Sequence, residues 1–208
     1  MEAVNPPALL PLIGYLDFAG IAVFALSGAV VATARRLTLV TFIFFAVVTA
    51  VGGGTTRDVL IGAPVFWIGN NAVLLTCLAA ALLVWFTPAR LWGGRTLLWL
   101  DAVGLAAYAS YGAAKALAYA VAPLPAIAVG VLTACLGGII RDVLANEPSI
   151  LLRPELYVTA AALSAALVVG LLLLGVAPPL AGGVAALAGC LLRGAAIWRG
   201  WCLPAYRR

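Results

Sequence analysis

Residues 53–60 read Gly-Gly-Thr-Thr-Arg-Asp-Val-Leu, and residues 137–144 read Gly-Gly-Ile-Ile-Arg-Asp-Val-Leu. The two strings are 84 positions apart, and the same offset aligns Asp17 with Asp101 without a gap. Chance similarity between apolar segments would align alanines and leucines, but it would not align these glycines and charges. The chain therefore contains an internal repeat.

The composition is that of a membrane protein. Of the 208 residues, 65% are hydrophobic and only 9% are charged, whereas soluble domains carry about 25% charged residues. The hydrophobic residues form runs of about 20 residues, the length that a helix needs to cross a bilayer. The net charge of +5 does not indicate a nucleic-acid partner, because the basic residues are scattered and form no stripe.

Seven spans are predicted from these runs and from the residues that end them. They cover about residues 12–34, 39–60, 71–86, 96–121, 124–145, 155–174 and 180–198. Arginines follow the odd-numbered spans, including Arg199, Arg207 and Arg208 in the tail, and no basic residue follows the even-numbered spans. By the positive-inside rule, the N-terminus lies outside and the C-terminus lies in the cytoplasm. We expect a multi-pass protein of the cell (inner) membrane.

The repeat predicts the architecture. Each copy contains three spans, an odd number, so the second copy crosses the membrane in the opposite direction. We expect an all-α integral membrane fold with residues 12–94 as the first three-helix repeat and residues 95–175 as the second, inverted repeat. Residues 176–208 form a seventh helix and a cytoplasmic tail. Proteins built this way usually place their site near the midplane, between the two copies.

Glycines interrupt the second and fifth spans. They are Gly52, Gly53, Gly54, Gly137 and Gly138. A glycine inside a helix costs up to about 1 kcal/mol relative to alanine. One interpretation is a broken helix whose loosened backbone lines a water-filled path, and the other is close packing between helices. Three adjacent glycines exceed what one packing contact needs, so we predict a helix break.

Each repeat carries one aspartate at the start of its first span and an Arg-Asp pair at the end of its second span. These residues are Asp17, Arg57 and Asp58 in the first repeat and Asp101, Arg141 and Asp142 in the second. An unpaired charge inside a membrane is costly, and adjacent residues on a helix do not face each other. We predict that each arginine pairs with an aspartate of its own repeat. Such pairs are either structural staples or part of a pore.

One face of the fourth span is polar. Its residues are three and four positions apart, as on one side of a helix, and they are Asp101, Gly104, Tyr108, Tyr111 and Lys115. Lys115 is the only lysine, and Val31 holds the matching position in the first repeat. We predict that Lys115, Tyr108 and Tyr111 line or gate a pore; the alternative for Lys115 is snorkelling to the membrane surface. The further candidates for the pore lining are Ser27, Thr49 and Thr133.

The two Gly-Gly-x-x-Arg-Asp motifs, each on the second span of an inverted three-helix repeat and followed by a seventh helix, resemble the trimeric intracellular cation channel family. The resemblance is to its shorter prokaryotic members and covers nearly the whole chain. It implies a homotrimer in which each protomer has its own hourglass pore, lined by spans one, two, four and five and conducting potassium. Leu136 stands where the first repeat has Gly52, so we expect a milder break in the fifth span.

The residues themselves leave two functions open. One is a passive cation channel, and the other is a secondary transporter of a small solute such as glycine, because broken helices in inverted repeats are typical of transporters too. Potassium selectivity comes from the resemblance, since the chain has no Thr-Val-Gly-Tyr-Gly filter. An enzyme is disfavoured, because the chain has no histidine, no paired-cysteine metal site and no nucleophile elbow. We expect no metal site and no cofactor. The expected partners are the permeant potassium ion, membrane lipid and further copies of the chain.

Overall fold

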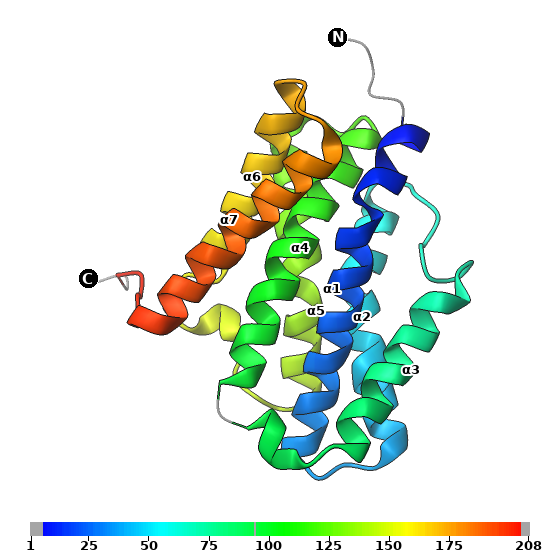
Figure 1. Cartoon of the computed structure of the whole chain (residues 1–208), viewed down its shortest axis with the longest axis vertical. Coiled ribbons are helices and arrows are strands. Elements are labelled where there is room, and N and C mark those ends of the chain that lie inside the picture. The colour runs from blue at the N-terminus through cyan, green and yellow to red at the C-terminus, as the bar shows by residue number, and fades with distance from the viewer. Residues whose placement is uncertain (1–5, 94, 205–208) are drawn as a thin grey trace.

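The computed structural model describes residues 6–93 and 95–204, with side-chain environments from residue 14 onward. These residues form seven α-helices and two short 3₁₀ helices (Figure 1). The α-helices are α1 (Pro6–Ala34), α2 (Leu39–Leu60), α3 (Asn71–Phe86), α4 (Thr96–Ala118), α5 (Pro123–Leu144), α6 (Val158–Leu173) and α7 (Pro178–Arg199). The all-α, seven-helix fold is therefore confirmed, and the predicted spans match these helices closely except that α1 begins earlier. The boundary residue Gly94 and the tail residues Arg207 and Arg208 lie outside the described residues.

The helices differ in length. Helices α1, α2, α4, α5 and α7 contain segments of 21–23 residues that are long and apolar enough to cross a membrane. Helices α3 and α6 have 16 residues each, which is about 24 Å at 1.5 Å per residue and less than the roughly 30 Å of a bilayer core. Both short helices hold the third position of their repeat, and each follows a long loop. Each of these loops reaches back to the charged end of the preceding helix.

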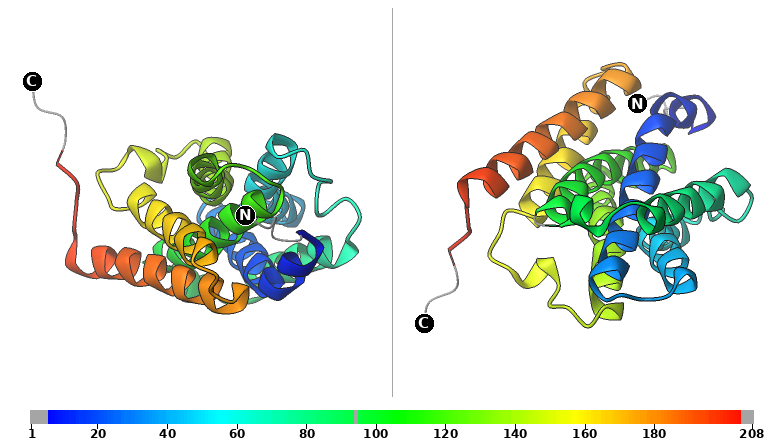
Figure 2. Two further views of the ribbon diagram at one scale, coloured as in Figure 1. Left: turned by 90° about the horizontal axis from the view of Figure 1, so that it is seen from above. Right: turned by 60° about the horizontal axis from the view of Figure 1, so that its bottom comes forward.

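Helices α1, α2, α4 and α5 form the centre of the molecule. Helix α1 packs against α2 and α4, and α5 packs against the same two helices. Helix α3 flanks the first pair, α6 flanks the second pair, and α7 lies against α4 and α6 (Figures 1 and 2). Helices α1 and α4, which match in the repeat, run in opposite directions (Figure 1). The matched residues Phe24 and Tyr108 meet between them with ring centroids 5.2 Å apart. The inverted repeat is therefore visible in the packing.

The glycine motifs do not break their helices. Helix α2 is continuous through residues 52–54, and α5 is continuous through residues 136–138. The predicted break is wrong for α2, and so is the milder break predicted for α5. In α2 the hydroxyls of Thr55 and Thr56 also donate to the carbonyl oxygens of Val51 and Gly52, at 2.7 and 3.0 Å. The carbonyl groups of this segment are thus engaged within the helix itself.

Close packing explains the glycines instead. A Cβ atom on Gly53 would collide with the carbonyl oxygen of Thr133, and a Cβ atom on Gly137 would collide with that of Thr49. The two contacts are the same contact seen from the two repeats, since each pair is related by the offset of 84 residues. Small residues let helix backbones approach closely in membranes. The motif therefore fixes the crossing of α2 and α5.

Candidate functional site

The first charge cluster lies where α1, α4 and α5 meet. Arg141 on α5 donates from Nη1 and Nη2 to the two carboxylate oxygens of Asp101 on α4, at 2.7 and 2.9 Å. Its Nε and Nη2 donate to Asp142 Oδ1 at 3.0 and 2.7 Å, and Nη1 also donates to the Ser27 hydroxyl at 2.9 Å. Only 1% of the Arg141 surface is exposed. Bidentate arginine–carboxylate pairs are the strong form of this interaction, so this cluster, called the inner cluster below, is tightly held.

The second cluster lies at the opposite end of the central bundle formed by α1, α2, α4 and α5. Arg57 on α2 donates from Nε to Asp58 at 2.7 Å, but its Nη1 lies 4.0 Å from Asp17. Its guanidinium carbon is 5.0 Å from the ring centroid of Tyr111. Lys115 donates from Nζ to Asp58 Oδ1 at 2.8 Å. Each arginine thus lies near aspartates of its own repeat, and the second cluster, called the outer cluster below, adds a lysine from the other repeat.

A main-chain amide closes each cluster. Phe66 N donates to Asp58 Oδ2 at 3.0 Å, and Ile150 N donates to Asp142 Oδ2 at 3.1 Å. Phe66 and Ile150 are related by the same offset of 84 residues. Each motif aspartate therefore ties down the loop that follows its helix, while the arginine faces the bundle. The repeat offset was a signal that could have identified these loop positions from the sequence.

The polar stripe of α4 is buried in the bundle. Lys115 is 5% exposed and forms an ion pair, so the snorkelling alternative is wrong. The Tyr108 hydroxyl donates to the Ala50 carbonyl oxygen at 2.8 Å, and the Tyr108 ring fills the space beside Gly20. Tyr108 therefore lies within the contact between α1, α2 and α4.

The two threonines beside the crossing of α2 and α5 are buried as well. The Thr133 hydroxyl donates to the Val129 carbonyl oxygen at 2.6 Å. The Thr49 hydroxyl has no hydrogen-bond partner within the described part of the chain, and it lies beside Gly28. An unpartnered hydroxyl in an otherwise apolar crossing is the kind of group that binds water. Thr49 therefore keeps free hydrogen-bonding capacity at this crossing.

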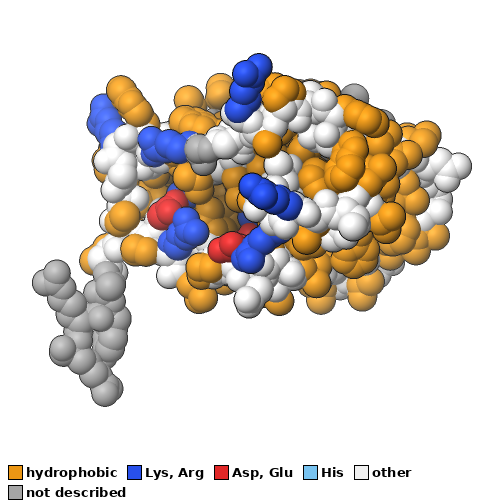
Figure 3. Space-filling view, turned by 90° about the horizontal axis from the view of Figure 1, so that it is seen from below, with side chains coloured by type: hydrophobic (Ala, Val, Ile, Leu, Met, Phe, Trp, Pro, Cys, Tyr) orange, Lys and Arg blue, Asp and Glu red, His pale blue; other side chains and the backbone are white. Residues whose placement is uncertain are grey.

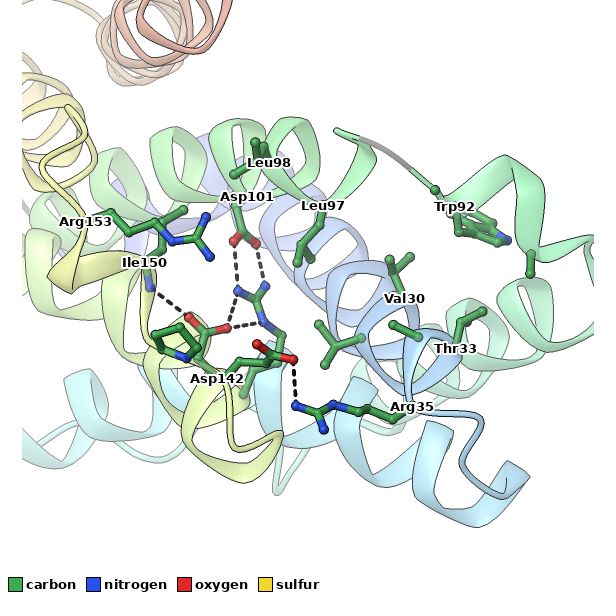
Figure 4. Close-up of a pocket in the computed structure, with 17 residues that line it drawn as sticks. Val30, Thr33, Arg35, Trp92, Leu97, Leu98, Asp101, Asp142, Ile150 and Arg153 are labelled. Carbon is green, nitrogen blue, oxygen red and sulfur yellow. Dashed lines mark hydrogen bonds and ion pairs between the residues drawn. The ribbon is translucent and has the colours of Figure 1, made fainter. Parts of the chain in front are cut away.

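A cavity of about 420 Å³ opens at the lower end of the molecule and reaches the inner cluster. Figure 3 shows basic side chains around the hollow on this face, and Figure 4 shows the carboxylates of Asp101 and Asp142, two of the lining residues, turned toward one guanidinium group at the cavity. Its mouth carries the Arg35–Glu147 ion pair, at 2.6 Å. Its apolar wall consists mainly of Val30, Val31, Leu97, Leu98 and Ile150. A largely apolar vestibule, with charged groups at its mouth and at its inner end, therefore leads from the surface to a buried Arg–Asp pair.

The sequence analysis missed one buried charge. Arg193 on α7 is 1% exposed and contacts Glu155 at 2.5 Å and the ring of Tyr157, whose centroid is 5.6 Å from the guanidinium carbon. The signal was an arginine inside an otherwise apolar helix. It belongs to no repeat motif, because α7 has no counterpart in the repeat.

Fold and charge clusters together define a polytopic membrane protein of the inverted-repeat class, with ionisable groups at both ends of its central bundle. The chain matches the family described as glycine transporter over residues 14–89 and again over residues 98–173. The two matched segments are displaced by the same 84 residues as the sequence repeat. A UPF0126 membrane protein of Vibrio cholerae is 44% identical over 72% of this chain and 64% of its own length. The UPF0126 inner membrane protein YadS of Escherichia coli is 43% identical over 72% of this chain and 73% of its own.

Two solved structures of cation channels are similar to this chain over nearly its whole length. A trimeric intracellular cation channel orthologue from Rhodobacter sphaeroides superposes with a TM-score of 0.84 and 41% identity, covering 91% of this chain and 98% of that chain. A further cation channel of this type has a TM-score of 0.81 and 32% identity, covering 94% and 97%. The chain belongs to the family described as glycine transporter and is a prokaryotic member of the trimeric intracellular cation channel family.

Proposed function

We propose that the chain is a potassium-conducting cation channel, with one conduction path in each protomer of a homotrimer. One observation carries the proposal: two buried charge clusters lie at opposite ends of the bundle formed by α1, α2, α4 and α5. Ionisable residues inside membranes usually mark an ion or solute path. Solved relatives that are cation channels support the same activity here.

The path runs along the bundle from the vestibule to the outer cluster. The inner cluster contributes one arginine against two aspartates, Asp101 and Asp142, so it carries a net negative charge that attracts cations. In the outer cluster, Lys115 and Arg57 offset Asp17 and Asp58. The rings of Phe24 and Tyr108 fill the space between the helices, so the arrangement described here is a non-conducting one. Opening requires these rings to move apart.

The arginines at one end of the molecule support the proposed orientation in the membrane. The vestibule mouth carries Arg35 and Arg153, and Arg36 and Arg90 are exposed nearby in the loops at the same end. Positively charged loops remain on the cytoplasmic side. The vestibule thus opens to the cytoplasm, and the N-terminus and the outer cluster face the opposite side.

Planar bilayers test the channel directly. Purified protein in a tenfold KCl gradient is expected to give unitary currents that reverse near the potassium equilibrium potential, about 59 mV from zero for a monovalent ion. Reversal near zero, or with the sign expected for chloride, would contradict cation selectivity. The glycine transporter description of the family supports a second candidate. Ion-coupled accumulation of glycine in proteoliposomes, without unitary current steps, would replace the channel with that transporter.

Replacing Lys115 by alanine is expected to change the open probability or its voltage dependence, with trimer assembly unchanged. Lys115 donates to Asp58 from the opposite repeat, so its removal changes the charge balance at the outer end of the path. A full crossing of the membrane by one charge is worth about 2.3 kcal/mol per 100 mV, and a partial displacement carries a fraction of that. Single-channel recording measures the effect, with Lys115→Arg as the variant that keeps the charge. Unaltered gating and conductance in Lys115→Ala would leave this lysine only a structural role.

A further inference from the structure

Helix α7 lies outside the repeat, yet it carries a buried charge. Arg193 donates from Nη2 to Glu155 Oε2 at 2.5 Å, and its guanidinium carbon lies 5.6 Å from the ring centroid of Tyr157. Arginine inside a membrane helix is costly and is usually retained for a function. The vestibule does not include Arg193 among its lining residues. Its role must therefore be exerted through the residues that it touches.

Tyr157 connects this arginine to the motif of α5. Its side chain is buried, and its hydroxyl lies 3.2 Å from the point where a Cβ atom on Gly138 would be. Arg141 Nη2 lies 3.8 Å from the same point. Gly138 thus leaves room for the tyrosine hydroxyl beside the arginine of the inner cluster. Within the described residues, this hydroxyl has no hydrogen-bond partner.

Glu155 connects Arg193 to the wall of the vestibule. It belongs to the loop between α5 and α6, which includes Arg153 at the cavity wall and Ile150, the amide donor to Asp142. The same loop also forms an antiparallel bridge, between Glu155 and Cys202. One buried arginine therefore contacts both the loop and the aromatic residue that border the inner cluster.

In the first repeat, an aromatic residue also lies beside the matching glycine, but the arginine on its ring comes from α2 and not from α7. A Cβ atom on Gly54, which matches Gly138, would lie 2.6 Å from the ring of Phe66. That ring also lies against Arg57, 5.5 Å from its guanidinium carbon. In the first repeat, then, the aromatic residue over the glycine comes from the loop and stacks directly on the motif arginine. In the second repeat, Tyr157 takes this place, and an arginine from α7 lies on its ring.

We infer that Arg193 is a positioning residue for the inner charge cluster: it holds Tyr157 over Gly138 and fastens the loop 150–157 against α5. In this role it keeps Arg141 in its paired geometry with Asp101. The inference rests on the proposed channel function for its effect on conduction. Its structural part, the fastening of the loop, is measurable without any current.

Hydrogen exchange on the full-length protein in lipid nanodiscs tests the fastening. Arg193→Gln is expected to speed exchange across residues 147–157, because the loop loses its hold through Glu155, while the matched loop at residues 62–70 stays unchanged. Arg193→Lys keeps the charge opposite Glu155 and is expected to restore most of the protection. Arg199→Gln, an exposed arginine of the same helix, is the control and is expected to change neither loop. Equal exchange in wild type and Arg193→Gln would overturn the inference.

Single-channel recording tests the effect on gating. Arg193→Gln is expected to shift the open-closed equilibrium by about threefold or more, the scale of coupling through one or two packed residues. Tyr157→Phe removes only the hydroxyl beside Gly138 and is expected to shift it in the same direction. The double variant is expected to add little, since both changes act on one contact chain.

The outcomes separate the two proposals. If wild-type protein gives no unitary currents, the channel function fails, and the exchange comparison still decides the role of Arg193. If wild type conducts and both Arg193→Gln and Tyr157→Phe gate normally, the positioning role is overturned even if the variants lose thermal stability. If Arg193→Gln does not fold, Glu155→Gln decides, because it removes the charge to which Arg193 Nη2 donates and is expected to speed exchange across residues 147–157 in the same way; unchanged exchange in Glu155→Gln would then overturn the inference.

Discussion

Replacing Asp101 by alanine is expected to lower the free energy of unfolding by about 3–5 kcal/mol, the usual effect of removing one partner from a buried ion pair. Both Asp101 oxygens accept from Arg141, and both side chains are 1% exposed. Without Asp101, two nitrogens of a buried guanidinium lose their main acceptor. Thermal unfolding of the detergent-purified protein, measured as the loss of folded protein with temperature, reports the change.

The vestibule mouth offers the matched control. Glu147 pairs with Arg35 at 2.6 Å, but the two side chains are 51% and 42% exposed. Glu147→Ala is expected to cost about 0–1 kcal/mol, as for exposed pairs. Combining Asp101→Ala with Arg141→Leu and Asp142→Asn is expected to be less harmful than Asp101→Ala alone, because the buried guanidinium and both buried carboxylates are then removed together. Equal losses for Asp101→Ala and Glu147→Ala would contradict the tight pairing of the inner cluster.

Replacing Gly53 by alanine is expected to destabilise the protein by about 1–3 kcal/mol or more, the range for overpacking a close contact. The new methyl group would meet the backbone carbonyl of Thr133, which cannot rotate away as a side chain can. Gly137→Ala is expected to have a similar effect, because it meets the carbonyl of Thr49 in the same way. The yield of folded protein and its midpoint of thermal unfolding report the change.

Gly170 on α6 provides the contrast for this prediction. A Cβ atom there would meet nothing within 4 Å. Gly170→Ala is therefore expected to be neutral or to stabilise the helix by up to about 1 kcal/mol. Had the motif glycines served to break α2, alanine at position 53 would also have favoured the helix. If Gly53→Ala behaves like Gly170→Ala, the packing explanation is wrong.

Much of the fold was predictable because the residues that end the helices and the residues that define the repeat can be located in the sequence. Arg35 and Arg36 stop the first run of apolar residues, Thr87 and Pro88 stop the third, and α1 and α3 end there in the structure. The repeat and its inversion followed from counting spans. The association of each motif arginine with aspartates of its own repeat followed from matched depth in the membrane, which sequence position supplies.

Contacts between the repeats were not predictable in the same way. The helix break at Gly53 was predicted from the local energetic cost of a glycine inside a helix. The reason that a glycine is needed there is the close approach of the Thr133 carbonyl, which lies 80 residues away along the chain. The ion pair between Lys115 and Asp58 was not predicted, because Lys115 breaks the repeat symmetry: Val31 holds the matching position. Arg193 was not predicted for a related reason: it belongs to no repeated motif and has no counterpart in either repeat.

The crossing of α2 and α5 has a consequence for how the protein is made. The Gly53 surface of α2 finds its partner at residue 133, and chains are synthesised at about 5–20 residues per second. During the roughly 4–17 s needed for the next 84 residues, the first three helices are in the bilayer with that surface bare. The outer cluster is also incomplete during this time, because Tyr111, which lies against Arg57, and Lys115, which pairs with Asp58, are made later. The newly inserted half must therefore be shielded by lipid, water or the insertion machinery until its inverted copy arrives.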